Sequence, residues 1–121
     1  MAKILLVDDE SETINLLESM VKMGGHETLT VLESRNAIQA IEKFLPDIVL
    51  LDIMMPEISG ITICELIKAN ANTRHIKVMI VSALSDDGTR KDASNAGAYL
   101  FITKPVLPRT LTQHIKDLTA N

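Results

Sequence analysis

The chain has 121 residues, of which 46% are hydrophobic and 23% are charged, and its formal net charge at pH 7 is −4. These values predict one globular domain with one hydrophobic core, and they exclude a disordered chain. The acidic balance and the 2% aromatic content argue against binding nucleic acid or an anionic membrane through bulk charge or base stacking. No apolar run is long enough to span a bilayer or to form a secretory signal. The single cysteine, Cys64, excludes an internal disulfide, and we expect a cytoplasmic protein.

Five short apolar runs, rich in β-branched residues, are spaced along the chain. Their lengths are typical of β-strands, and they lie at Ile4–Val7, Thr28–Leu32, Ile48–Leu51, Val78–Val81 and Tyr99–Ile102. Four of the runs are almost continuously apolar, as buried central strands are. The second run instead alternates polar and apolar residues, which is the pattern of a half-exposed edge strand.

Each apolar run is followed by an amphipathic segment of helical period. In the first segment, Ser11 is placed to cap a helix, and Gly24 and Gly25 are placed to end it. The second segment opens at Ser34 and closes before Pro46. The expected inward-facing residues are Ile14, Leu17 and Val21 in the first segment, Ala37, Ile38, Ile41, Phe44 and Leu45 in the second, and Ile63, Leu66 and Ile67 in the third, which runs from about residue 59 to 70.

The last two helical segments complete the pattern. One runs from about Asp87 to Ala96, and the other starts at Pro108, a residue favoured at the first helical position, and turns Leu111, Ile115 and Leu118 inward. Five strands alternating with five helices predict a doubly wound α/β fold, with a parallel sheet covered by helices on both faces. A second strand at the edge agrees with the flavodoxin-like strand order 2-1-3-4-5. We expect residues 1–121 to form a single domain, with no output domain in this chain.

Polar side chains stand directly after four of the apolar runs. Asp8 and Asp9 follow the first run, Asp52 the third, Ser82 the fourth and Lys104 the fifth. In doubly wound sheets, ligands bind outside the carboxyl ends of the strands, so these side chains are expected to meet at one edge. Carboxylates that lie close together raise one another's pKa unless a cation intervenes. Oxygen ligands of this kind suit Mg²⁺, and the lack of histidine or cysteine at the strand ends argues against zinc.

Each of these residues also has a structural explanation when it is taken alone. Asp8 or Asp9 can cap the following helix, Asp52 and Ser82 can be turn residues, and Lys104 can be a solvated surface charge. The functional interpretation is favoured because four strand ends carry the required residue type at the same time.

These residues lie in longer segments that match a known family. The segments, in chain order, are Ile4–Glu10, Asp47–Pro56, Val81–Ala83, Ala96–Ala98 and Thr103–Pro105. Through them the chain resembles the response-regulator receiver domains of two-component signalling, of the chemotaxis-regulator type, over essentially its whole length. The resemblance implies a phosphoprotein that catalyses only its own phosphorylation and dephosphorylation and is otherwise not an enzyme.

The resemblance implies a role for each acidic residue. Asp52 corresponds to the phosphoacceptor, which takes a phosphoryl group from a histidine kinase or a histidine phosphotransfer protein. Asp9 and Asp52 correspond to direct Mg²⁺ ligands, the backbone carbonyl of Met54 supplies a further oxygen, and Asp8 acts through metal-bound water. Mn²⁺ is an expected substitute for Mg²⁺.

The resemblance also implies that the remaining motif residues bind the phosphoryl group and respond to it. Lys104 pairs with a phosphoryl oxygen, and its bond to Pro105 resembles the family's cis peptide. Ser82 hydrogen-bonds another phosphoryl oxygen, and an aromatic residue of the last strand then rotates inward. Phe101 is the preferred aromatic and Tyr99 the competing one. This switch would change the face formed by the fourth helix, fifth strand and fifth helix, for a downstream target protein or a linked output domain.

The chain departs from the family's common pattern in three places. Glu57–Gly60 reads Glu-Ile-Ser-Gly where the family often has Gly-Met-Asp-Gly, so partner choice can differ. Met54 and Leu84 are both apolar, and we expect them to restrict the attacking water and lengthen the life of the phosphoryl group. Thr112–His114 replaces residues of a known dimer face, so we expect a monomer or a weak, phosphorylation-dependent dimer.

Three other classes of protein share parts of this pattern. A Mg²⁺-dependent aspartyl phosphatase needs a second carboxylate two residues after the nucleophile, and this chain has Met54 there. A nucleotide- or flavin-binding module needs a glycine-rich loop after the first strand, where Asp8 and Asp9 stand instead. A pseudo-receiver that binds partners without phosphorylation has no need of the complete set of acids. The histidines, His26, His75 and His114, are expected to be surface residues.

Overall fold

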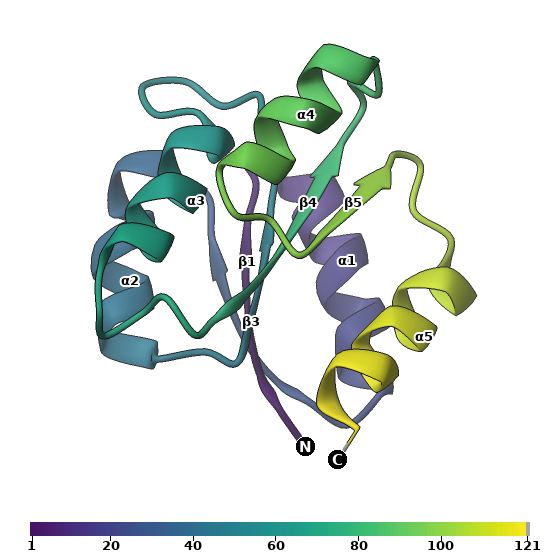
Figure 1. The fold of residues 1–121 in the computed structure, drawn as a ribbon. Coiled ribbons are helices and arrows are strands. Elements are labelled where there is room, and N and C mark those ends of the chain that lie inside the picture. Colours follow the sequence, from purple (N-terminus) through teal and green to yellow (C-terminus); the bar gives the residue numbers. More distant parts are fainter. Residues whose placement is uncertain (121) are drawn as a thin grey trace.

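The computed structural model describes residues 1–120 and confirms the alternation of strands and helices (Figure 1). The elements, in chain order, are β1 (Lys3–Val7), α1 (Ser11–Met23), β2 (Glu27–Val31), the short 3₁₀ helix η1 (Ser34–Asn36), α2 (Ala37–Phe44), β3 (Ile48–Leu51), α3 (Gly60–Ala69), β4 (Lys77–Ser82), α4 (Asp87–Asn95), β5 (Leu100–Thr103) and α5 (Pro108–Thr119). All five strands are parallel and lie in the order β2-β1-β3-β4-β5, as predicted.

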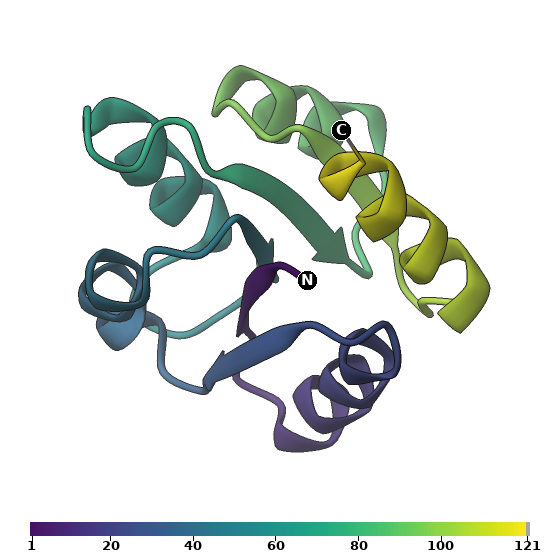
Figure 2. The ribbon, with the colours of Figure 1, turned by 90° about the horizontal axis from the view of Figure 1, so that it is seen from below.

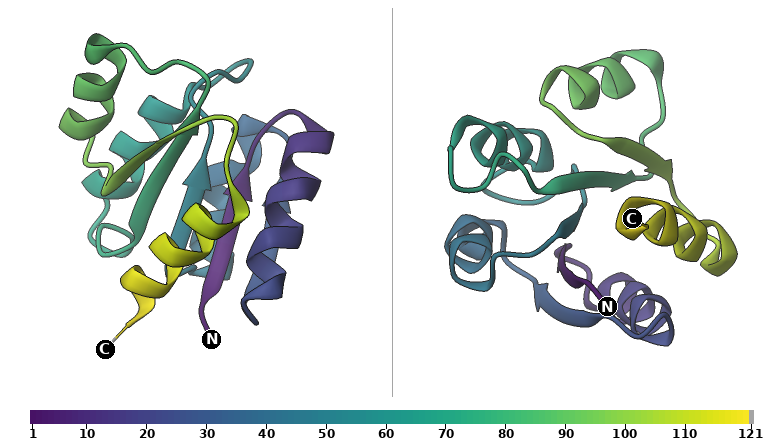
Figure 3. Two further views of the ribbon diagram at one scale, coloured as in Figure 1. Left: turned by 90° about the vertical axis from the view of Figure 1, so that its right-hand side faces the viewer. Right: turned by 60° about the horizontal axis from the view of Figure 1, so that its bottom comes forward.

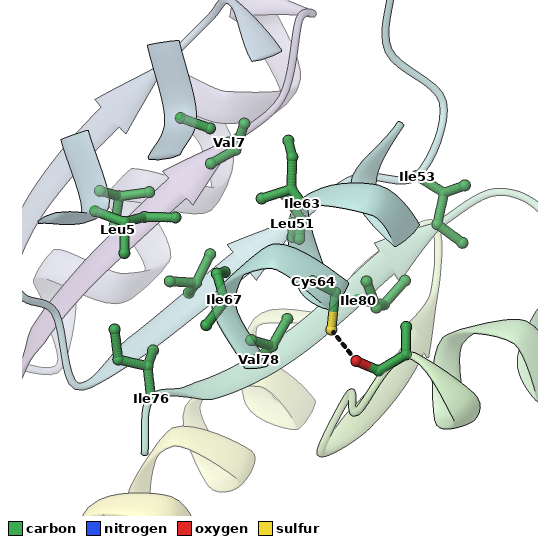
Figure 4. Packing of buried hydrophobic residues seen from close by; sticks show 14 of the residues in the cluster. Leu5, Val7, Leu51, Ile53, Ile63, Cys64, Ile67, Ile76, Val78 and Ile80 are labelled. Atoms are coloured by element: carbon green, nitrogen blue, oxygen red, sulfur yellow. Dashed lines mark hydrogen bonds between the residues drawn. The ribbon is translucent and has the colours of Figure 1, made fainter. Parts of the chain in front are cut away.

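Helices cover both faces of the sheet. Helices α1 and α5 pack on one face and α2, α3 and α4 on the other, as the view from below and the two further views make clear (Figures 2 and 3). Successive residues of a strand point to opposite faces, so β1 supplies Leu5 and Val7 to one core and Ile4 and Leu6 to the other. The face under α2, α3 and α4 is filled by branched aliphatic side chains (Figure 4).

Local signals in the sequence explain most of the helix ends. Helix α1 stops before Gly24 and Gly25, and Gly25 takes a left-handed φ of +83° that favours glycine. Ser59 caps α3 by accepting a hydrogen bond from the Thr62 N–H, and Pro108 is the first residue of α5. The predicted cap at Ser11 is wrong, because α1 already begins at that residue and Glu10 precedes it without a side-chain cap.

Three predictions about burial are also wrong. Leu45 is 53% exposed, because it lies just beyond the last residue of α2, where the chain leaves the helix. Leu66 is 47% exposed, because it lies beside the buried stripe of α3 and not within it. That stripe consists of Gly60, Ile63, Cys64 and Ile67. The fifth strand forms the second edge of the sheet, as the predicted strand order requires, but it is mostly half-buried rather than fully buried. Among residues 1–120, no helix has both the length and the apolar character needed to cross a membrane.

Candidate functional site

The predicted site residues lie together at the carboxyl end of the sheet, the upper edge in Figure 1. Backbone hydrogen bonds extend the sheet by one residue and fix three of them. The N–H of Asp8 donates to the Val31 carbonyl at 3.2 Å, and that of Asp52 donates to the Val7 carbonyl at 3.1 Å. The N–H of Lys104 donates to the Ser82 carbonyl at 2.9 Å. The site is therefore built on the sheet itself rather than on free loops.

The three carboxylates form a compact cluster. Asp8, Asp9 and Asp52 each offer one oxygen, and these oxygens all lie within 4.8 Å of one another. Asp8 and Asp52 are buried, at 2% and 6% exposure, whereas Asp9 is exposed. The expectation of a convergent acidic edge is thus confirmed, and the cluster opens to solvent on the side of Asp9.

Lys104 is the cation of the cluster. Its ammonium nitrogen donates a hydrogen bond to Asp8 Oδ2 at 3.0 Å and lies 3.8 Å from Asp52 Oδ1. Burial opposes the charged ammonium, but the hydrogen bond to Asp8 and the charges of Asp52, Asp8 and Glu10 raise the pKa of Lys104 above its ordinary value. The other oxygen of Asp8 accepts a hydrogen bond from the Glu10 N–H at 3.0 Å. Asp8 is therefore held from two sides.

Burial destabilises the charged form of the Asp52 side chain. Burial raises the pKa of its carboxyl from 3.8 to about 6, Lys104 lowers it and Asp8 raises it further. A buried carboxylate with this shift gains from any additional positive charge placed near it. The Asp52 side chain is thus a place where a cation increases stability.

The donor set fits a magnesium ion. Carboxylate oxygens that cluster at a partly exposed edge are the ligands of a hard divalent cation that keeps several of its waters. Asp9 and Asp52 would hold the ion directly and Asp8 would act through a bound water, as the resemblance implies. The alternative that Asp8 or Asp9 caps α1 is not met, because Glu10 occupies the cap position.

Ser82 and the two candidate aromatics occupy different environments. Ser82 is buried at 1% exposure, and its Oγ accepts a hydrogen bond from the Leu84 N–H at 3.1 Å. Phe101 is half-buried and packs against the core under α2, α3 and α4. Tyr99 precedes β5 and is 58% exposed, with Lys77 above its ring. Of the two aromatic residues, Phe101 is therefore the one that contacts the core.

Sequence reasoning missed the residue that covers Phe101. The guanidinium carbon of Arg90, on α4, lies 4.7 Å from the centroid of the Phe101 ring, and its Nη2 donates to Thr103 Oγ1 at 2.9 Å. Arg90 Nε also donates to the Ser85 carbonyl at 3.1 Å. The contacts join residues of α4, β5 and the loop after β4, and no local sequence pattern indicates them.

Two further predictions can be compared with the structure. The Lys104–Pro105 peptide is cis, as the resemblance implies. His75 is exposed as expected, but His26 and His114 are half-buried, and the Nδ1 of His26 accepts a hydrogen bond from the Ala2 N–H at 3.0 Å. His26 is therefore a structural residue. It lies at the amino end of the sheet, and the acidic cluster lies at the carboxyl end.

Comparison with known proteins agrees with the fold and the site. Residues 4–116 match the response regulator receiver domain family. The chain is 37% identical over 118 residues to the response regulator PleD of Caulobacter vibrioides, covering 98% of this chain and 26% of PleD. It is 28% identical to the polar-differentiation response regulator DivK of Brucella ovis, covering 94% of this chain and 93% of DivK.

Solved structures give the same answer. A putative response regulator from Chloroflexus aurantiacus has a TM-score of 0.93 and 28% identity, with 99% of this chain and 98% of that chain covered. The BeF₃-activated receiver domain of DrrB has a TM-score of 0.89 and 29% identity, with 100% and 99% covered. The fold and the acidic edge thus define a two-component signalling module. This chain belongs to the response regulator receiver domain family.

Proposed function

We propose that this domain is a phosphoacceptor switch in which Asp52 takes a phosphoryl group from the phosphohistidine of a histidine kinase or histidine phosphotransfer protein. The observation that carries the proposal is the convergence of three carboxylates with Lys104 at one edge of the sheet. The BeF₃-activated form of the similar DrrB domain supports it, because beryllofluoride has the tetrahedral shape of a phosphoryl group.

The transfer is a substitution at phosphorus. One oxygen of the Asp52 carboxylate forms a bond to the phosphorus atom while the P–N bond of the donor breaks, and the imidazole keeps the electron pair and takes up a proton. A carboxylate is a weak nucleophile, so positioning and charge neutralisation supply most of the catalysis. Mg²⁺, held by Asp9, Asp52 and the Met54 carbonyl, would neutralise phosphoryl oxygens. Lys104, already 3.8 Å from Asp52, reaches the phosphoryl group by a small movement away from Asp8.

The added charge then changes the face formed by α4, β5 and α5. An aspartyl phosphate brings about −1.5 to −2 charge and three acceptor oxygens. The Ser82 hydroxyl turns toward one of these oxygens and releases the Leu84 N–H that it now accepts from. The loop after β4 moves with it, and Arg90, which is bonded to Ser85 in that loop, moves off the Phe101 ring. Phe101 can then turn inward, and the altered face becomes the signal.

The partners follow from this chemistry. The phosphoryl donor is a histidine kinase or phosphotransfer protein, and the output lies in a target protein or in a domain linked to this one. The chain spans about a quarter of the length of PleD and less than half of that of the transcriptional regulators named ycf27 that it also matches. Its own chemistry is limited to gaining and losing one phosphoryl group, in the cytoplasm, as a monomer or a weak phosphorylation-dependent dimer.

The test is to incubate the protein with Mg²⁺ and acetyl phosphate or phosphoramidate and to measure its intact mass. We expect a gain of one phosphoryl group in the wild type and none in Asp52→Asn. A pseudo-receiver would gain nothing with any donor. An aspartyl phosphatase would instead turn over an added phosphate ester many times, and that result would also reject the proposal.

A further inference from the structure

Ser34 makes an unusual connection between two loops. It is a buried polar residue, at 4% exposure, at the start of η1, three residues after the end of β2. Its hydroxyl donates a hydrogen bond to the Pro56 carbonyl and accepts one from the Ile58 N–H at 3.2 Å. Both of these groups belong to the loop between β3 and α3, which begins at the proposed phosphoacceptor. A side chain of the β2–α2 connection therefore holds the tip of the loop that follows Asp52.

The tip of this loop is a strained turn. The Ile58 N–H also donates to the Pro56 carbonyl at 2.9 Å, and Glu57 between them has a φ of +72°. A hydrogen bond across one residue with a positive central φ is the mark of the rare, strained form of γ-turn. Glutamate is a poor residue for this conformation, which glycine adopts freely. Ser34 bonds to the same two groups that close the turn, so it holds Glu57 in its strained conformation.

The base of the loop is fixed separately. A Cβ on Gly60 would collide with the Asp52 carbonyl, and the Gly60 N–H donates to the Ile53 carbonyl at 3.0 Å. The loop thus returns onto the backbone of Asp52, and the stretch that contains Met54 lies between this close contact and the turn held by Ser34. Asp9 lines the same surface groove as Ser34, Pro56 and Glu57, so the turn borders the acidic cluster directly.

We propose that Ser34 is a positioning residue for the metal site: its hydroxyl holds the strained Pro56–Ile58 turn and thereby the Met54 carbonyl at the distance from Asp9 and Asp52 that Mg²⁺ requires. The proposal rests on the proposed function for the assignment of Met54 as a source of a metal oxygen. Without the hydroxyl, Glu57 relaxes to a negative φ and the loop between its two anchors is rebuilt.

The experiment measures Mg²⁺ binding through its effect on thermal unfolding, which requires no phosphorylation. The variants are Ser34→Ala, Glu57→Gly and the double variant. The matched control is Thr73→Val, which removes another buried hydroxyl, bonded to the Ile67 carbonyl at 2.8 Å just before β4, at the opposite end of the sheet. Circular dichroism establishes that each variant folds.

Removing partners that orient metal ligands weakens metal binding by about 10–100-fold, and Ser34 acts through one further link, so we expect a rise of about five- to tenfold in the Mg²⁺ Kd of Ser34→Ala. Glu57→Gly in the Ser34→Ala background removes the strain, and we expect it to restore the Kd to within about twofold of the wild type. Thr73→Val is expected to lower the unfolding temperature without changing the Kd.

Three results would overturn the proposal. These are an unchanged Kd in Ser34→Ala, an equal rise in Thr73→Val, or no recovery in the double variant. Acetyl phosphate labelling of the same proteins separates this proposal from the proposed function. If the wild type binds Mg²⁺ and takes no phosphoryl group, the proposed function fails, while the Kd values still decide the role of Ser34.

Discussion

The amino and carboxyl ends of the parallel sheet differ in the partners and the charge balance of their polar groups. At the amino end, the Lys3 N–H donates to an oxygen of Asp47 at 2.8 Å, the Ala2 N–H donates to His26, and the Lys68 ammonium donates to the Arg74 and Ile76 carbonyls. Each of these groups has a hydrogen-bond partner from a segment distant in the sequence or in a neighbouring turn.

At the carboxyl end, three carboxylates lie within reach of one another, and Lys104 bonds to one of them. Burial and the neighbouring charge of Asp8 leave Asp52 with a pKa of about 6. The difference is one of charge: the three carboxylates of the carboxyl end face the ammonium of Lys104, so a bound cation would stabilise this end of the sheet.

The largest effect is expected from Lys104→Met. This change leaves the buried Asp8 carboxylate without its ammonium partner, and we expect a loss of about 2–4 kcal/mol in the free energy of unfolding in the absence of divalent cations. Urea denaturation in the presence of a chelator measures it. The control is Lys22→Met, which breaks the exposed Lys22–Glu18 pair at 3.8 Å and should cost less than about 1 kcal/mol. Equal losses in the two variants would remove the contrast between the ends of the sheet.

Asp52→Asn should have the opposite sign. The pKa of Asp52 is raised from 3.8 to about 6 in the folded protein, so the folded state binds more protons than the unfolded chain between these values. Stability is therefore lost as the pH rises through this window, by up to about 2–3 kcal/mol. We expect metal-free Asp52→Asn to be more stable than the wild type near neutral pH. A stability difference between the two proteins that stays constant from pH 4 to pH 7 would contradict this.

Met54→Asn should shorten the life of the aspartyl phosphate. Met54 is 61% exposed and Leu84 is 40% exposed, and each follows a site residue, Asp52 or Ser82, by two positions in the chain. We expect the polar side chain to admit and orient the attacking water and to speed dephosphorylation by roughly tenfold, or about 1.4 kcal/mol in activation free energy. The decay of the phosphorylated mass after removal of the donor measures the rate. Met54→Leu is the control and should keep the wild-type rate, and an unchanged rate in Met54→Asn would reject the shielding role.

The smallest effect is expected at the amino end. The pKa of His26 is lowered, first by burial and then by the N-terminal charge, and its Nδ1 must be unprotonated to accept from the Ala2 N–H. The unfolded chain therefore binds the proton more readily, and stability is lost as the pH falls below about 6.5. Removing this one hydrogen bond should matter by about 1 kcal/mol. His26→Gln, which can still accept the hydrogen bond, should lack this pH dependence, and an identical acid slope in both proteins would contradict the assignment.

The sequence allowed the sheet order and the acidic cluster to be predicted because both depend on local patterns. Strand lengths and alternation indicate a doubly wound sheet, and the topology then brings Asp8, Asp52 and Lys104 to one edge. Contacts between distant side chains carry no such pattern. The sequence pattern predicts only a helix start at Ser34, whereas its hydroxyl bonds to groups 22 and 24 residues away. The position of Arg90 over Phe101 depends on how α4 packs. Leu66 is exposed rather than buried, because the helical period alone does not define which residues at the border of an apolar stripe face the core.

The central claim, that Asp52 is the phosphoacceptor, is tested most directly by locating the modification. Protein labelled with phosphoramidate and Mg²⁺ is treated with hydroxylamine, which converts an acyl phosphate to a hydroxamate and leaves phosphoserine intact, and its peptides are analysed by mass spectrometry. We expect a hydroxamate on Asp52 and on no other residue. A phosphoryl group on Ser82 or a histidine, or a hydroxamate on Asp8 or Asp9, would contradict it.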